Sequence, residues 1–256
     1  DLHCDGFEYE ASVIIPCKNR VRTIGTAIKS ALSQVVKAPY KFNVIVVDDN
    51  SEDGSVDVIK SIVAEGHENL TYIAQDKTWH AIGGNWNVAL HHEKCGRFAI
   101  QLDSDDTYFD ENTVQKFIDA FHEQNCAMVV GTYQLTDFDG NMIPPGVIDH
   151  KEWTPDNGRN NALRIHGLGA PRGFYTPMLR TINFPTTKYG EDYAVGLRVS
   201  REYQIGRIYD VVYNCRRWDD NSDANCDIVT MNNNHLYKDR IRTWELKARI
   251  QMNEGK

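Results

Sequence analysis

Aspartates are concentrated in one short stretch, "LDSDDTYFD" at residues 102–110, which follows an apolar run. Clustered carboxylates repel one another unless a cation neutralises them. Oxygen ligands favour Mg²⁺ or Mn²⁺, which commonly bridge one or two carboxylates and the phosphates of a substrate. Asp103, Asp105 and Asp106 therefore predict a divalent metal site. The alternative is a solvated acidic turn, and Asp110 is expected to cap the helix that follows.

A second acidic group, "VDDNSEDGS", occupies residues 47–55. An aspartate at the end of a buried strand can accept hydrogen bonds from a nucleobase or a ribose, which makes Asp48 and Asp49 candidates for nucleotide binding. The spacing partly matches a calcium loop, but Lys60 stands where that loop needs a bidentate glutamate, so calcium is rejected. The alternative is an ordinary turn between a strand and a helix.

A third signal is the adjacent pair Glu191 and Asp192, which opens a helical pattern with an apolar face. Acids at a helix start are common because they interact favourably with the helix dipole. The functional interpretation is a general base that projects from the helix start into a cleft.

The elements that carry these groups alternate regularly. Apolar and β-branched runs predict strands, and apolar residues at helical spacing predict helices between them. The strands are expected at 11–16, 41–51, 70–75 and 97–102, and the helices at 23–34, 55–66 and 83–96. This order predicts a parallel sheet covered by helices on both faces, with ligands at the carboxyl ends of the strands, where the acidic groups fall.

The second half is less regular. A helix is expected at 111–124, a hairpin at 127–143 turning at Asp139-Gly140, loops at 144–175, a helix at 191–202 and one or two strands at 205–215. In the tail, residues 235–252, apolar side chains recur at helical spacing and are expected to pack on the domain or on a partner. They are Tyr237, Ile241, Trp244, Ala248 and Met252.

Length, net charge, cysteine spacing and hydropathy argue against some classes of protein. The chain has 256 residues and a net charge of −8, which argues against non-specific nucleic acid binding. Its six cysteines lack redox or zinc spacing and are expected to be reduced, mostly buried thiols of a cytosolic protein. No apolar stretch reaches 18 residues, so no membrane span is expected. The chain begins with Asp1 and not with Met, which leaves removed targeting segments open.

Taken together, the strand "ASVIIP" at 11–16, "VDDNSEDGS", "LDSDD" and "GED" at 190–192 occur in the order and spacing that resemble a family 2 glycosyltransferase of the GT-A fold, from residue 11 to about 218. The resemblance implies an α/β, Rossmann-like, mostly parallel sheet flanked by helices. It also implies a nucleotide-sugar-binding half at 11–110, an acceptor-binding half with the catalytic base at 111–226 and a helical tail at 227–256.

The resemblance further implies roles for individual residues. Asp49 would bind the nucleobase, Asp103 would lie near the ribose, and Asp105 would ligate Mn²⁺ or Mg²⁺ together with Asp103. Asp192, with Glu191 beside it, would be the general base. The remaining residues expected around the donor are Pro16, Asn19, Asp48, Ser51, Asn87, Asp106, Arg172, Arg217 and Trp218.

Two positions depart from the family pattern. Trp86 stands where an arginine is usual before Asn87, so a phosphate contact is either missing or supplied by Arg172, Arg216 or Arg217. Trp218 stands where a histidine is usual, and tryptophan cannot ligate a metal. A third protein ligand from that loop is therefore not expected, although Trp218 could stack on the donor or close over it.

The implied activity is inverting transfer of a sugar from a UDP- or GDP-linked donor to a saccharide or glycolipid acceptor, by single displacement. The expected location is the cytoplasm, either free or peripheral at the inner face of the membrane. Residues 235–252 would then contact the membrane surface or another subunit.

Three other classes compete. Asp103-x-Asp105-x-Thr107 after a strand also resembles the nucleophile motif of haloacid dehalogenase-like phosphatases, but three strand–helix units precede it here. A sugar-1-phosphate nucleotidyltransferase would need a glycine-rich basic loop after the first strand, which "PCKNRVRT" lacks. A non-catalytic nucleotide-sugar-binding module is disfavoured because Asp105 and Asp192 are both present.

Overall fold

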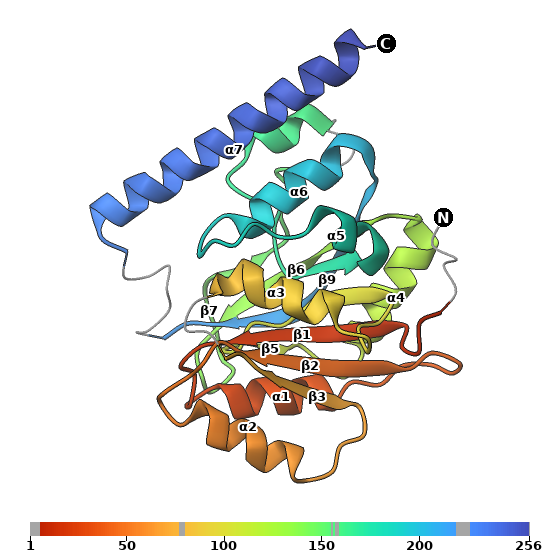
Figure 1. Ribbon diagram of the computed structural model, residues 1–256, viewed down its shortest axis with the longest axis vertical. Coiled ribbons are helices and arrows are strands. Elements are labelled where there is room, and N and C mark those ends of the chain that lie inside the picture. The colour runs from red at the N-terminus through yellow and green to blue at the C-terminus, as the bar shows by residue number, and fades with distance from the viewer. Residues whose placement is uncertain (1–5, 77–79, 155, 157–158, 219–225, 256) are drawn as a thin grey trace.

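A nine-stranded sheet runs through the molecule in the computed structural model, which describes residues 6–76, 80–154, 156, 159–218 and 226–255 (Figure 1). The strand order is β3 (Leu70–Ala74), β2 (Phe42–Asp48), β1 (Ala11–Cys17), β4 (Phe98–Gln101), β8 (Arg172–Tyr175), β6 (Met128–Thr136), β9 (Ile205–Arg216) and β5 (Thr107–Tyr108), and β7 (Met142–Ile148) pairs with β6. This order matches the predicted α/β class with its Rossmann-like first half.

The first four long strands are all parallel: β1 pairs with β2 and with β4, and β2 pairs with β3. Both faces of this half are buried, which explains its β-branched runs. Val13 and Ile15 contribute to one core, whereas Ile14 between them contributes to the core on the opposite face. The strand period of two thus assigns neighbouring residues to different layers.

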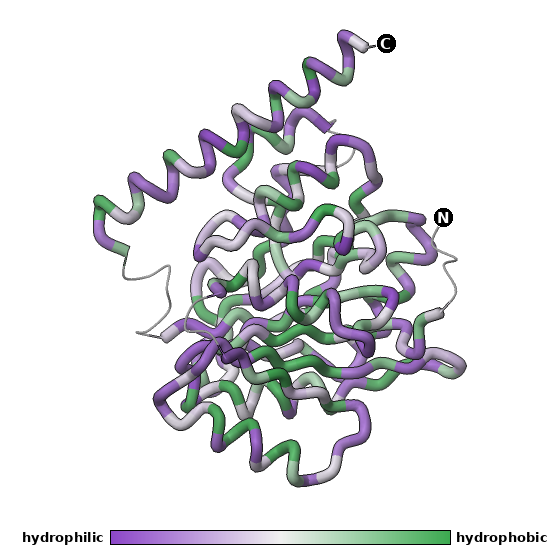
Figure 2. Tube along the Cα trace, viewed as in Figure 1, coloured by the Kyte–Doolittle hydropathy of each residue, from purple (hydrophilic) through white to green (hydrophobic). Residues whose placement is uncertain are grey.

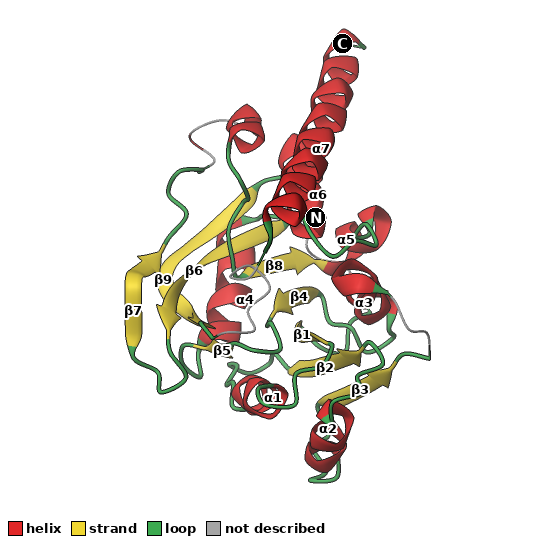
Figure 3. Cartoon of the chain, turned by 90° about the vertical axis from the view of Figure 1, so that its left-hand side faces the viewer, coloured by secondary structure: helices red, strands yellow, loops and turns green. Residues whose placement is uncertain are grey.

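Helices cover the two faces of the sheet (Figure 3). One layer contains α1 (Ile24–Leu32), α2 (Ser55–Val63) and α4 (Thr113–Gln124), and the other contains α3 (Ala81–His91), α5 (Thr176–Ile182) and α6 (Glu191–Glu202). The helices predicted in the first half are confirmed, with α3 beginning two residues earlier and ending five residues earlier than expected from the sequence.

The prediction of loops throughout 144–175 is wrong. The segment contains most of β7, a 3₁₀ helix at Arg159–Arg164 and the short strand β8, which lies between β4 and β6 and pairs antiparallel with both. A four-residue strand that contains a glycine is too short for a periodic pattern. A Cβ on Gly173 would lie 2.8 Å from the ring of Phe117, so the glycine permits α4 to pack closely on this strand.

The predicted hairpin is confirmed, since β6 and β7 pair antiparallel around a turn with Gly140 at positive φ. The expected helix cap by Asp110 is wrong: its carboxylate accepts a hydrogen bond from the backbone N–H of Asn112, before α4 begins. The five described cysteines are free thiols, and three of them are buried, as expected.

The tail forms α7 (Ile228–Glu254), longer than the expected 235–252. Tyr237 and Ile241 pack on the domain as predicted, but Trp244 is 61 % exposed, so only part of the expected apolar stripe lies in the contact face. That face also contains Glu245 and Arg249, which pair at 2.9 Å. Figure 2 shows the resulting mixture of polar and apolar residues along α7, in contrast to the apolar central strands. Among the described helices, none is long and apolar enough to cross a membrane.

Candidate active site

Two adjoining cavities open where β1 and β4 end, at the edge predicted for ligands. The larger has a volume of about 480 Å³ and the smaller about 370 Å³. The residues that line both are Pro16, Arg20, Ile82, Ser104 and Lys188. The larger cavity also contains the acids of "DSDD" and the pair that begins α6, so three distant segments of the sequence meet in one cleft.

One wall of the larger cavity is built by the turn after β4. Both carboxylate oxygens of Asp103 lie 3.0 Å from the side-chain nitrogen of Gln101. Asp106 is buried and accepts hydrogen bonds from the Tyr213 hydroxyl at 2.8 Å and the Arg216 backbone N–H at 2.7 Å. Asp106 therefore secures this turn to β9.

The electrostatics of this wall separate its three acids. Burial raises the pKa of Asp103 and raises that of Asp106 well above its usual range, and the neighbouring carboxylates add to both effects. Asp105 is less enclosed, with the Trp218 indole N–H at 3.3 Å and the Arg20 guanidinium nitrogen Nε at 3.9 Å. Asp105 is thus the acid of this wall best placed to reach a ligand.

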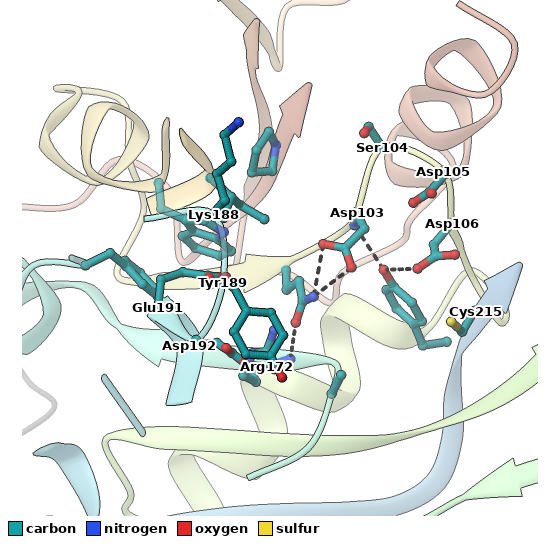
Figure 4. A pocket seen from close by; sticks show the side chains of 18 of the residues that line it. Asp103, Ser104, Asp105, Asp106, Arg172, Lys188, Tyr189, Glu191, Asp192 and Cys215 are labelled. Carbon is teal, nitrogen blue, oxygen red and sulfur yellow. Dashed lines mark hydrogen bonds and ion pairs between the residues drawn. The ribbon is translucent and has the colours of Figure 1, made fainter. Parts of the chain in front are cut away.

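Glu191 and Asp192 form the opposite wall, as Figure 4 shows. Arg172 at the start of β8 donates to Asp192 at 2.6 Å and to the Gly169 carbonyl at 2.8 Å. The neighbouring Glu191 is 7 % exposed, and burial, with a contribution from Asp192, raises its pKa from 4.5 to about 8. The two adjacent acids therefore lie in different environments: Asp192 is paired with a cation, and Glu191 is buried and largely protonated near neutral pH.

The smaller cavity contains Asp49, as predicted from its place after β2. Its carboxylate accepts from the His80 backbone N–H at 3.3 Å and lies 3.0 Å from the His80 ring nitrogen Nδ1. Asn85 of α3 lies in the same cavity and is 3 % exposed, and its side-chain oxygen has no hydrogen-bond partner among the described residues. Sequence analysis missed both His80 and Asn85; an asparagine in the first turn of the expected helix 83–96 was the available signal.

Other predicted donor residues support loops instead of lining the two cavities. The Asp48 carboxylate accepts hydrogen bonds from the Ser51 hydroxyl at 2.5 Å and from the Ser51 backbone N–H at 3.0 Å. The Asn19 side-chain oxygen accepts a hydrogen bond from the Glu52 backbone N–H at 2.9 Å. Asn87 makes two 2.8 Å hydrogen bonds with the backbone of Phe184. These side chains stabilise the loops and do not line either cavity.

The predicted cations are divided between two tasks. Arg217 and Arg172 both line the larger cavity, where Arg172 is paired with Asp192, whereas Arg216 donates to the Asp105 carbonyl at 2.7 Å. Sequence analysis did not single out Lys188 or Lys238, which also line the larger cavity. Trp218 contacts Asp105 at the rim, and the segment directly after it, 219–225, lies outside the described residues.

Comparison with known proteins identifies relatives. The model of glycosyl transferase family 2 matches residues 12–183, which is more than half of the chain. The chain is 25 % identical over 213 residues to a poly(ribitol-phosphate) beta-glucosyltransferase of Bacillus spizizenii, covering 80 % of this chain and 32 % of the relative. It therefore spans about a third of that relative's length.

A second relative is closer in length. The UDP-Glc:alpha-D-GlcNAc-diphosphoundecaprenol beta-1,3-glucosyltransferase WfgD of Escherichia coli is 25 % identical over 205 residues, covering 78 % of this chain and 74 % of WfgD. Among solved structures, Staphylococcus aureus TarS residues 1–349 in complex with UDP-GlcNAc superimposes with a TM-score of 0.69 and 21 % identity, covering 93 % of this chain and 71 % of that one. The TarS likeness shows that the two folds correspond.

Proposed function

The chain belongs to glycosyl transferase family 2, and we propose that it transfers a sugar from a nucleoside diphosphate sugar to an acceptor hydroxyl, with inversion at the anomeric carbon. The observation that supports this activity is the larger cavity, in which the "DSDD" turn faces Asp192 across one cleft. The family match ends at residue 183, so the role of Asp192 is supported by this geometry and by its partner Arg172.

The donor is proposed to lie along both cavities. Its base would occupy the smaller cavity at Asp49 and Asn85, and its diphosphate and sugar would extend toward Asp103 and Asp105. UDP is the favoured nucleotide because WfgD carries UDP-Glc in its name and the superimposed TarS structure contains UDP-GlcNAc. GDP is the alternative nucleotide, and binding measurements with UDP- and GDP-sugars distinguish the two.

The acids of the "DSDD" turn fit a divalent cation that is held by few protein ligands. Among the described residues no group of three His, Cys, Asp or Glu side chains converges on one point. Mg²⁺, however, is usually bound by one or two carboxylates together with substrate phosphates. Asp105, with Asp103 beside it, would hold Mn²⁺ or Mg²⁺, which when bound offsets the charge that develops on the leaving diphosphate.

On the opposite wall, Asp192 is proposed to remove the proton of the acceptor hydroxyl as its oxygen forms the new bond to the anomeric carbon. The bond from that carbon to the diphosphate oxygen breaks at the same time, and its electron pair leaves with the nucleoside diphosphate. Arg172 donates to the Asp192 carboxylate at 2.6 Å and holds it in place. Glu191, buried beside it, would donate a hydrogen bond to a sugar hydroxyl.

The acceptor is proposed to be a saccharide or a glycolipid, since the name of WfgD includes a lipid-linked acceptor. It would enter over Tyr189 and Lys238, which line the acceptor side of the larger cavity. A glycolipid acceptor would place the protein at the cytoplasmic face of a membrane, with residues 235–252 as the candidate contact.

A donor panel tests the proposal. The protein is incubated with UDP- and GDP-sugars and Mn²⁺, and thermal stability and nucleoside diphosphate release are measured, with lipid-linked and soluble saccharides as acceptors. One donor is expected to raise the melting temperature and to release its nucleoside diphosphate in the presence of an acceptor. If no nucleotide sugar stabilises the protein while phosphate is released from monophosphate esters, the phosphatase interpretation of Asp103 replaces this one.

A further inference from the structure

Lys188 occupies the junction between the two cavities. It lines both of them, whereas Asp49 and Asn85 line only the smaller one and Asp105 only the larger one. Ser104 lines both cavities as well, and Figure 4 shows Ser104 and Lys188 on opposite sides of the cleft. A group that joins a base in the smaller cavity to a metal at Asp105 must pass between them.

The segment that carries Lys188 is fixed against α3. Asn87 holds the backbone of Phe184 with two 2.8 Å hydrogen bonds. One turn earlier on α3, a Cβ on Gly83 would lie 2.0 Å from the Pro185 carbonyl oxygen, so only glycine allows the segment to approach so closely. The segment 183–190 is therefore secured to the helix beside the smaller cavity, and Lys188 is exposed at its tip.

The charges around the junction leave Lys188 available. Arg172 is engaged by Asp192, and Arg20 lies 3.9 Å from Asp105 and donates to two backbone carbonyls. Lys188, in contrast, makes no hydrogen bond or ion pair with any described residue. On α3 itself, the buried Trp86 offers no cation to a phosphate. The cleft thus has one uncommitted cation where the two cavities join.

We propose that Lys188 binds the diphosphate of the donor and stabilises the departing nucleoside diphosphate from the side opposite Ser104. This assignment rests on the proposed transferase function and adds a cation that the expected arginines do not supply. A lysine acts here as a compact point charge that takes no part in making or breaking bonds. Its attraction increases as negative charge moves onto the diphosphate in the transition state.

The test compares a nucleoside diphosphate with its nucleoside. Affinities of wild type, Lys188→Ala and Lys188→Arg are measured by calorimetry for UDP, uridine, GDP and guanosine in Mn²⁺. For the nucleotide that wild type binds, Lys188→Ala is expected to lower the diphosphate affinity at least tenfold and to leave the nucleoside affinity unchanged. Lys188→Arg should restore most of the loss, and Lys60→Ala, an exposed lysine on α2, should match wild type.

Three results would overturn the assignment. One is an equal diphosphate affinity in Lys188→Ala and wild type. Another is an equal loss for the nucleoside, because Lys188 would then shape the pocket without contacting the diphosphate. The third is a loss of diphosphate affinity in Arg217→Ala but not in Lys188→Ala, which would move the contact to another cation that lines the larger cavity. If wild type binds neither UDP nor GDP, the transferase proposal itself fails.

Discussion

Two acidic clusters face each other across the larger cavity, and they accommodate their charge in different ways. At the start of α6, Arg172 neutralises Asp192 through a 2.6 Å ion pair. In the "DSDD" turn, the buried Asp106 is held by a hydroxyl and a backbone N–H, and the Arg20 guanidinium lies 3.9 Å from Asp105. The acid of one cluster is held by a close ion pair, whereas the buried acid of the other is held by uncharged donors.

The two clusters are connected by Gln101, the last residue of β4. Its side-chain nitrogen faces Asp103 at 3.0 Å, and its side-chain oxygen accepts the Arg172 backbone N–H at 3.1 Å. Because this amide contacts both walls, it helps to fix the distance between them. In the proposed function, proton transfer would take place at one wall and donor binding at the other.

Asp192→Asn gives the largest expected effect, because it removes the base and leaves the donor wall intact. Transfer should fall by about 10²- to 10⁴-fold, the usual contribution of a general base. The measurement is kcat with saturating donor and acceptor, together with donor affinity. Asp105→Asn is the matched variant, and it should instead lose metal-dependent donor binding. An equal loss of donor affinity in both variants would contradict the proposal that the two walls have different roles.

Tyr213→Phe tests how the donor wall is held. The Tyr213 hydroxyl accepts the Asp103 backbone N–H at 3.0 Å and donates to Asp106 at 2.8 Å, and Tyr213 is buried. Losing a buried hydroxyl that satisfies two groups should lower the free energy of unfolding by about 1–3 kcal/mol, measured by urea denaturation. Tyr209→Phe, on the exposed side of the same strand, should change it by less than about 0.5 kcal/mol.

Glu191→Gln tests the protonated member of the other cluster. The folded protein retains the Glu191 proton up to about pH 8, whereas the unfolded chain releases it near 4.5. Stability of the wild type should therefore decline as pH rises from about 4.5 to about 8, since the unfolded state binds fewer protons there. The variant lacks this decline, so its advantage in melting temperature should grow across that window. A pH-independent difference would show that Glu191 ionises normally.

Asp110→Ala should have the smallest effect. This carboxylate accepts the Asn112 backbone N–H and lies 3.9 Å from Lys116, outside the cavity. Exposed ion pairs contribute about 0–1 kcal/mol, so stability should fall by less than about 1 kcal/mol. Donor affinity, measured by calorimetry, should equal that of wild type. A lower donor affinity in this variant would mean that Asp110 also takes part in donor binding.

Local patterns predicted the parallel half of the fold and placed its acids correctly at strand ends. The places of Asp49 and Asp105 beside the cavities were predictable because a strand that ends in polar residues is visible within a dozen positions. The sequence did not predict the pairing of Arg172 with Asp192 or of His80 with Asp49. Each pair joins segments that only the folded sheet brings together. The same holds for Lys188, whose position depends on the contact of its segment with α3.

Adjacent residues also received different environments that no local pattern distinguishes. Glu191 and Asp192 are both acids at the start of one helix, yet one is buried and the other faces a guanidinium. The helix period sets the angle between them, but the surrounding loops decide which side is enclosed. In the same way, Asp106 is buried and the adjacent Asp105 is more accessible because their surroundings in the fold differ.

The position of β8 has a consequence for how the chain folds. Until residues 172–175 have been synthesised, β4 has β1 on one side and no partner on the other. The parallel half can therefore form early, because its neighbours are close in sequence, but it ends in an open edge. The short β8 closes that edge and joins it to β6. Because Arg172 is the first residue of β8, the same event brings the partner of Asp192 into place, so closure of the β4 edge and positioning of this guanidinium are one step.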